Sequence, residues 1–143
     1  MHETMKILIT LLFIMGSSFS QTNIEIKDLQ WKNRVLLVFP ADKNAKGLGL
    51  TDAIQVDLVD RDLIYFYFGD EFASNSPYTF TKNYQKELQK LYGSGSDKGN
   101  YVLIGKDGGS KLEEFGNEIN WQLLFSTIDS MPMRIREMKN KPQ

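Results

Sequence analysis

Cysteine is absent from this chain of 143 residues, and histidine occurs once, as His2. His2 falls in a segment that we expect to be removed, so the mature protein would contain neither residue. Their absence excludes Ser-His-Asp and Cys-His nucleophilic sites, thiol-disulfide exchange and the usual zinc sites. It also excludes disulfides, so packing of aromatic and aliphatic side chains must stabilise the domain. We therefore assign no catalytic residue and expect no metal and no cofactor.

An excess of charge of one sign is also missing. The chain carries 17 Lys and Arg against 18 Asp and Glu, which gives a formal net charge of -1. A nearly balanced charge indicates neither a nucleic-acid-binding surface nor a strongly membrane-seeking one. Binding of nucleic acid is therefore not expected.

Long hydrophobic runs are missing too. The apolar run at residues 7–15 follows Lys6 and precedes small residues, among them Ser18 and Ser20. It is far shorter than the roughly 20 residues that cross a bilayer. Charge, apolar core and small residues in this order are typical of a secretory signal peptide. We predict a signal peptide at residues 1–20, cleavage after Ser20, and a protein that is exported to the periplasm or secreted, with no membrane anchor.

The remaining residues, 21–143, have a length that suits one domain. Residues 35–39 and 63–68 are short, continuous apolar runs, which are typical of strands buried on both faces. Between them Thr51 can cap a helix that should end near Asp60. Two such strands joined by a helix make a parallel βαβ unit.

The second half of the domain predicts two helices and a β-hairpin. The patterns place them at residues 81–92 (helix), 101–104 and 110–115 (strands) and 121–131 (helix). Asp107-Gly108 is the turn of the hairpin, since both positions tolerate positive φ. Pro132 should stop or kink the last helix at Met131.

Two segments are less regular. Residues 23–29 could form a short edge strand or a simple lead-in. Residues 69–79 are rich in Asp, Asn, Ser, Pro and Gly, which predicts a long loop.

The predicted fold class is α/β, with the element order β-α-β-α-β-β-α. This is the order of a thioredoxin-like core, a mixed four-stranded sheet with strand order 2-1-3-4 and an antiparallel third strand. The loop after the first strand, where redox-active members place Cys-x-x-Cys, is here PADKNAK at residues 40–46. A proline expected near Asn100 is absent as well. Inherited oxidoreductase activity is therefore not expected.

Four pieces of the chain also carry a family resemblance: residues 31–39 (WKNRVLLVF), 61–63 (RDL), 103–111 (LIGKDGGSK) and 128–134 (IDSMPMR) with Glu137. Together they resemble P-DUDES, domain of unknown function 4174, a thioredoxin- or peroxiredoxin-like family. The resemblance covers nearly the whole mature chain. Relatives in animals lie inside extracellular sushi-repeat and matrix-associated proteins, which implies binding or adhesion. The resemblance to this family implies no established reaction.

Five residues are candidates for binding. Asp42, Lys43 and Lys46 lie where a thioredoxin-like fold exposes its active loop, and they could bind a ligand or partner or form a solvated connection. Arg134 and Arg136 could satisfy the free carbonyls at the end of the last helix. The alternative is an exposed Met and Arg patch for a partner.

Two other charged pairs and Lys106 are given structural or minor roles. Arg61-Asp62 is predicted to be a surface pair of little energetic weight. Lys106 belongs to the hairpin turn. Asp70-Glu71 is a poor candidate for glycosidase chemistry, which needs two carboxyls facing each other across a cleft.

The leading hypothesis is an exported, non-catalytic thioredoxin-like domain that binds a protein partner in the cell envelope or outside the cell. One alternative is an enzyme of unknown reaction that uses Asp42, Lys43 and the loop at residues 69–79. Another is a stress-related structural protein whose aromatic residues only fill its core.

Overall fold

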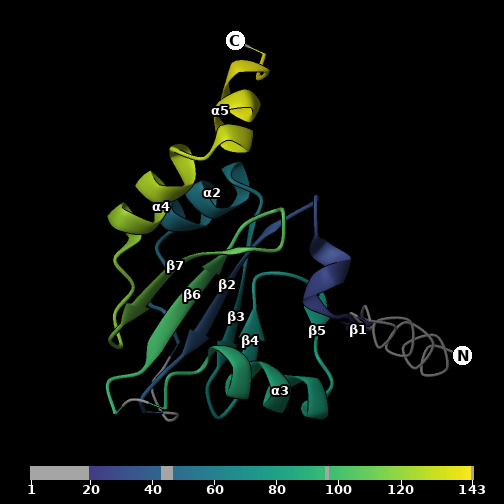
Figure 1. Cartoon of the computed structure of the whole chain (residues 1–143), viewed down its shortest axis with the longest axis vertical. Coiled ribbons are helices and arrows are strands. Elements are labelled where there is room, and N and C mark those ends of the chain that lie inside the picture. Colours follow the sequence, from purple (N-terminus) through teal and green to yellow (C-terminus); the bar gives the residue numbers. More distant parts are fainter. Residues whose placement is uncertain (1–19, 43–46, 96, 143) are drawn as a thin grey trace, which may run out of the picture.

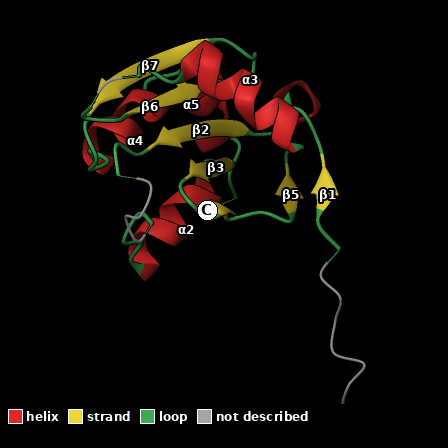
Figure 2. Cartoon of the chain, turned by 90° about the horizontal axis from the view of Figure 1, so that it is seen from below, coloured by secondary structure: helices red, strands yellow, loops and turns green. Residues whose placement is uncertain are grey.

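The computed structural model describes residues 20–42, 47–95 and 97–142. They form a five-stranded mixed sheet of order β4-β3-β2-β6-β7, with helices on both faces (Figures 1 and 2). The strands of this sheet are β2 (Arg34–Phe39), β3 (Leu63–Phe68), β4 (Phe72–Ser74), β6 (Asn100–Ile104) and β7 (Ser110–Phe115). Helix α3 (Lys82–Tyr92) contributes to the core on one face, and α2 (Asp52–Asp60) and α4 (Trp121–Asp129) contribute to the core on the other.

The predicted apolar runs are the central strands. β2 pairs in parallel with β3 and antiparallel with β6, so its backbone is bonded on both sides. All six residues of β2 are buried, because a helix layer covers each face of the sheet. The predicted α/β class with a mixed sheet is confirmed.

The helix starts follow from their caps. The Thr51 hydroxyl accepts a hydrogen bond from the Ile54 amide at 3.2 Å, and the Thr81 hydroxyl does the same for Tyr84. Each bond satisfies one of the free amides in the first turn.

The sheet has five strands where four were predicted, because residues 69–79 are not a plain loop. β4 pairs antiparallel with β3, and β5 (Tyr78–Thr79) pairs with β1 (Thr22–Asn23) in a separate sheet. Phe72 anchors β4 by packing its ring on Phe66 and Phe68. The Asn75 side chain bonds the backbone of β3 beyond that point, and this takes the place of further strand pairing.

The lead-in at residues 23–29 is mostly a short 3-10 helix, η1 (Ile26–Leu29), which packs Leu29 into the core. At the other end of the chain, α4 stops before Met131, as predicted. A further helix, α5 (Pro132–Lys139), then begins where a stop or a kink was expected. Pro132 occupies the first turn of α5, where its missing N–H costs nothing.

Candidate functional site

Three of the four polar or charged residues that are buried in the described part of the chain are cations, and they meet at one end of the sheet. Arg34 opens β2, Lys106 lies in the β6–β7 turn and Arg134 lies on α5; their exposed fractions are 1%, 8% and 2%. We use the name charge cluster for these cations and the groups they bind. Its members are Arg34, Arg61, Lys106, Arg134, Asp60, Asp62, Asp129 and Glu137.

Glu137 is the centre of one half of the charge cluster. Arg34 donates to its two carboxylate oxygens from Nη1 and Nη2 at 3.1 and 3.2 Å, and the Lys106 Nζ donates at 2.7 Å. Lys106 also donates to Asp62 at 2.9 Å. This half therefore joins the first core strand, the hairpin turn and the last helix.

Arg134 holds the other half. Its Nη1 donates to the main-chain carbonyl of Asp60 at 2.9 Å, and its Nη2 donates to the Asp60 carboxylate at 2.7 Å. Its Nε donates to Asp129, which also accepts two bonds from Arg61 at 3.0 and 2.9 Å. The Arg61 guanidinium in turn lies 4.5 Å from the centre of the Phe125 ring.

Two acids of the charge cluster, Glu137 and Asp129, have pKa values below their ordinary ones. Burial alone raises the pKa of Glu137, but the hydrogen bonds from Arg34 and Lys106 outweigh it and leave that pKa below its ordinary value. Burial acts in the same way on Asp129, and hydrogen bonds from Arg61 and Arg134 again lower its pKa overall. A carboxylate with a lowered pKa is a poor proton carrier near neutral pH. The cluster is therefore suited to holding elements in place.

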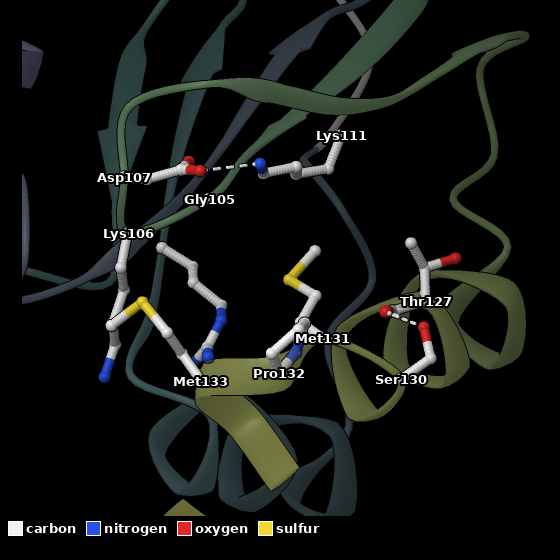
Figure 3. Close-up of a pocket in the computed structure, with 10 residues that line it drawn as sticks. Gly105, Lys106, Asp107, Lys111, Thr127, Ser130, Met131, Pro132 and Met133 are labelled. Carbon is white, nitrogen blue, oxygen red and sulfur yellow. Dashed lines mark hydrogen bonds and ion pairs between the residues drawn. The ribbon is translucent and has the colours of Figure 1, made fainter. Parts of the chain in front are cut away.

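A cavity of about 440 Å³ lies beside the charge cluster, between the β6–β7 turn and the junction of α4 and α5. Figure 3 shows the Asp107–Lys111 ion pair on one side of it and Met131, Pro132 and Met133 on the other. The lining is mixed, with flexible thioether chains facing polar groups. Its residues are Arg34, Gly105, Lys106, Asp107, Lys111, Thr127, Ser130, Met131, Pro132 and Met133.

Arg34 lines this cavity with an incompletely satisfied side chain. Its Nε is the one buried side-chain nitrogen or oxygen within the described residues that has no hydrogen-bond partner. A buried donor without an acceptor costs about 1–3 kcal/mol. A ligand in the cavity that offers a hydrogen-bond acceptor to Nε would remove this energetic cost.

The predicted binding residues do not come together. Arg134 is buried, and its side chain donates to a main-chain carbonyl at the end of a helix, as one of the two alternatives predicted. The carbonyl is that of Asp60 at the end of α2, however, and not one at the end of α4. Arg136 is exposed on α5. Asp42 is exposed after β2, while Lys43 and Lys46 lie outside the described residues.

The prediction for Arg61-Asp62 is wrong. The two side chains bind different partners, Asp57 and Asp129 for Arg61 and Lys106 for Asp62. Arg61 is largely buried, since α4 covers it. The Lys106–Gly109 turn is confirmed, with Gly108 at a φ of 86°.

Sequence reasoning missed Arg34, Lys106 and Glu137 as members of one cluster. Their signal was indirect: each of the four pieces that carry the family resemblance contains at least one member of the charge cluster. Charged residues at the margins of apolar runs are ordinarily solvated, and only the fold brings these together.

A comparison with protein families gives a match over most of the chain. The family described as "Domain of unknown function (DUF4174)" matches residues 25–137. No curated protein and no solved structure matches the chain. Within residues 20–42, 47–95 and 97–142, no helix has the length and apolar character needed to cross a membrane. The same residues hold no group of three or more His, Cys, Asp or Glu side chains placed to bind a metal ion.

Proposed function

The chain belongs to DUF4174, a family of domains of unknown function, and we propose that it is an exported, non-catalytic domain that binds a protein partner in the cell envelope or outside the cell. The binding site in this proposal is the cavity between the β6–β7 turn and the α4–α5 junction. The fold in this proposal is thioredoxin-like. Its support is the mixed sheet with a parallel β2–β3 pair, an antiparallel β6 and helices on both faces.

The chemistry of the chain favours binding over catalysis. It has no cysteine anywhere, so thiol chemistry has no residue to use. Glu137 and Asp129 of the charge cluster have lowered pKa values and are committed to ion pairs. These features leave recognition as the activity that the site supports best.

The unpartnered Arg34 Nε is the observation that carries the proposal. A carbonyl oxygen of a bound segment would accept from it, while an apolar side chain of that segment would lie against Met131 and Pro132. The Nε is covered in the unbound protein, so a side chain of the cavity must move first. Unbranched methionine side chains change conformation at low cost, and two of them form this wall.

In-cell photocrosslinking tests the proposed site. A photoreactive side chain at Thr127, on the cavity wall, should crosslink one protein that mass spectrometry identifies. The same group at Leu91, an exposed apolar residue on α3, is the matched control. In a second experiment the photoreactive side chain is placed at Ser130, which also lines the cavity. Adding Thr127→Trp to this variant should fill the cavity and abolish crosslinking of the same protein. Equal capture from Leu91, or capture that persists in Thr127→Trp, would remove the cavity from the proposal.

Export has a separate test. The protein made in its native cells should be recovered outside the cytoplasm with Gln21 as its first residue, by fractionation and N-terminal mass spectrometry. An intact chain in the cytoplasm would contradict export while leaving the binding site open to test.

A further inference from the structure

A second surface, on the opposite side of α2 from the core, exposes apolar side chains that the proposed function does not use. On α2, Val56 and Val59 are 67% and 74% exposed. On α5, Ile135 and Met138 are partly exposed and lie three residues apart, so they share one face of the helix. We use the name α2–α5 patch for these four residues.

The two helices meet at Asp60. Its carboxylate accepts from Arg134 on α5 and is also paired with Lys141, just beyond α5. Met138 follows Arg134 by one helical turn, which places it on the side of α5 that faces the end of α2. Figure 1 accordingly places α5 beyond α2, with the C-terminus rising away from the sheet. Val59 thus precedes Asp60 on α2, and Met138 lies one helical turn after the arginine that binds Asp60.

Exposed charges of opposite sign lie on the two helices of the α2–α5 patch: an acid on α2, which we call the acidic end, and two bases on α5, the basic end. Asp52 is the first residue of α2, about 12 Å along the helix from Asp60 at a rise of 1.5 Å per residue. Arg136 and Lys139 are exposed on α5. None of Asp52, Arg136 and Lys139 takes part in an ion pair within the part of the chain that the structure describes.

We propose that the α2–α5 patch binds the same patch of a second copy of this chain, in a two-fold symmetric dimer. A two-fold axis reverses the direction of the patch, so the acidic end of one copy meets the basic end of the other. Asp52 of each copy then lies opposite Lys139 and Arg136 of the other copy, so the contact occurs twice in the dimer. The valines and Met138 close the apolar centre between these charges.

The charge pattern favours a second copy over an unrelated protein. A surface that carries an apolar centre with an acid at one end and bases at the other is complementary to itself when turned by 180°. The four residues of the patch are far fewer than the roughly 20–30 residues that each partner contributes to a standard interface, so the dimer forms reversibly and its population depends on protein concentration.

Sedimentation equilibrium of the purified mature chain tests the proposal. The weight-average mass should rise from that of a monomer toward twice that value over roughly three decades of concentration. Val59→Glu should shift this rise at least 10-fold to higher concentration, because it places a charge in the apolar centre. Leu91→Glu changes a residue that is equally exposed, at 74%, but lies on α3, and it should leave the rise unchanged. A monomer at every concentration, or an equal effect of the two variants, overturns the proposal.

Charge reversal gives a second, independent readout. Asp52→Lys and Lys139→Glu should each weaken association, since each puts like charges opposite one another. The double variant should recover most of the lost association, because it restores the pairs with their signs exchanged. Thermal unfolding of each variant separates a loss of association from a loss of helix α2 or α5. Failure of the double variant to recover association, with all variants folded, rejects the two-fold arrangement.

Discussion

The centre of the sheet and the end that carries the charge cluster are both buried, but by opposite means. At the centre, Leu36, Phe66 and Leu103 have no exposed surface and contact other apolar side chains. At the end, α5 buries a single residue of its own, Arg134, and hydrogen-bonded ion pairs hold it to the body. The centre therefore contributes most of the stability, whereas the charge cluster decides where α5 lies.

The comparison follows from the energetics of burial. Apolar surface removed from water stabilises the fold wherever it is placed. A buried ion pair gains little net free energy, since the loss of hydration offsets the attraction, but losing one partner is costly. The charge cluster thus determines the position of α5 but adds little net free energy to the stability of the fold.

The largest effect should come from the apolar centre. Phe66→Ala leaves a cavity beside the rings of Phe72 and Phe80 and should lower the free energy of unfolding by about 3–5 kcal/mol. Urea unfolding at neutral pH measures the change. Leu123→Ala, which is partly exposed on α4, is the control and should cost far less. Similar losses in both variants would show that the centre is not the main source of stability.

Breaking one partner in the charge cluster should have the next largest effect. Glu137→Gln removes the negative charge shared by Arg34 and Lys106, at a cost of about 2 kcal/mol once partial exposure is allowed for. Glu113→Gln, on the exposed side of β7, should change stability by less than about 0.5 kcal/mol. Hydrogen exchange should also rise in α5 but not in β2. A uniform increase across both elements would contradict a local role for Glu137.

Acid should act on the charge cluster before it acts on the centre. The pKa of Glu137 and that of Asp129 are lowered in the fold, below ordinary values of 4.5 and 3.8. Their contribution is present above those ordinary values and is lost as pH falls through the lowered ones. Stability measured from pH 7 downward should therefore decline below about pH 5, and less steeply in Glu137→Gln. If stability declined equally steeply with falling pH in the parent protein and in Glu137→Gln, protonation of Glu137 would not be a cause of the acid sensitivity.

Replacing the ion pair by apolar residues should be nearly neutral. Arg34→Met combined with Glu137→Leu removes the Arg34–Glu137 pair and the unpartnered Nε, and leaves Lys106 paired with Asp62. We expect a free energy of unfolding within about 1 kcal/mol of the parent protein, in contrast to the single change Glu137→Gln. A double variant that is as unstable as the single variant would show that the pair itself contributes net stability.

The smallest effect should come from the exposed pair at the rim of the cavity. Lys111→Ala breaks the bond to Asp107 and should change stability by less than about 0.5 kcal/mol. A loss of stability as large as that in Glu137→Gln would mean that the exposed Lys111–Asp107 pair contributes as much as the more buried pairs of Glu137.

Local patterns were sufficient for most of the elements. The apolar runs predicted β2 and β3, the cap Thr51 predicted α2, and the pattern of residues 81–92 predicted α3. Pro132 predicted the end of α4. β4 and β5 escaped prediction because they are only three and two residues long, and because their pairing depends on β3 and β1.

The candidate site was much less predictable than the elements. Arg34 and Lys106 stand 72 positions apart in the numbering, yet both donate to Glu137. No local pattern distinguishes a charged residue that will be buried from one that stays in water. The resemblance pieces marked the right segments but not which side chains would meet.

The sequence by itself determined the absence of thiol chemistry, the α/β pattern and the positions of the main helices and strands, because composition, periodicity and caps act over a few neighbouring residues. Only the tertiary structure decided that Arg34, Lys106, Arg134 and Glu137 are buried together and that a cavity opens beside them. The reason is that burial of a charge depends on partners from distant segments, and those partners reach one another only after the apolar sheet has brought the segments together.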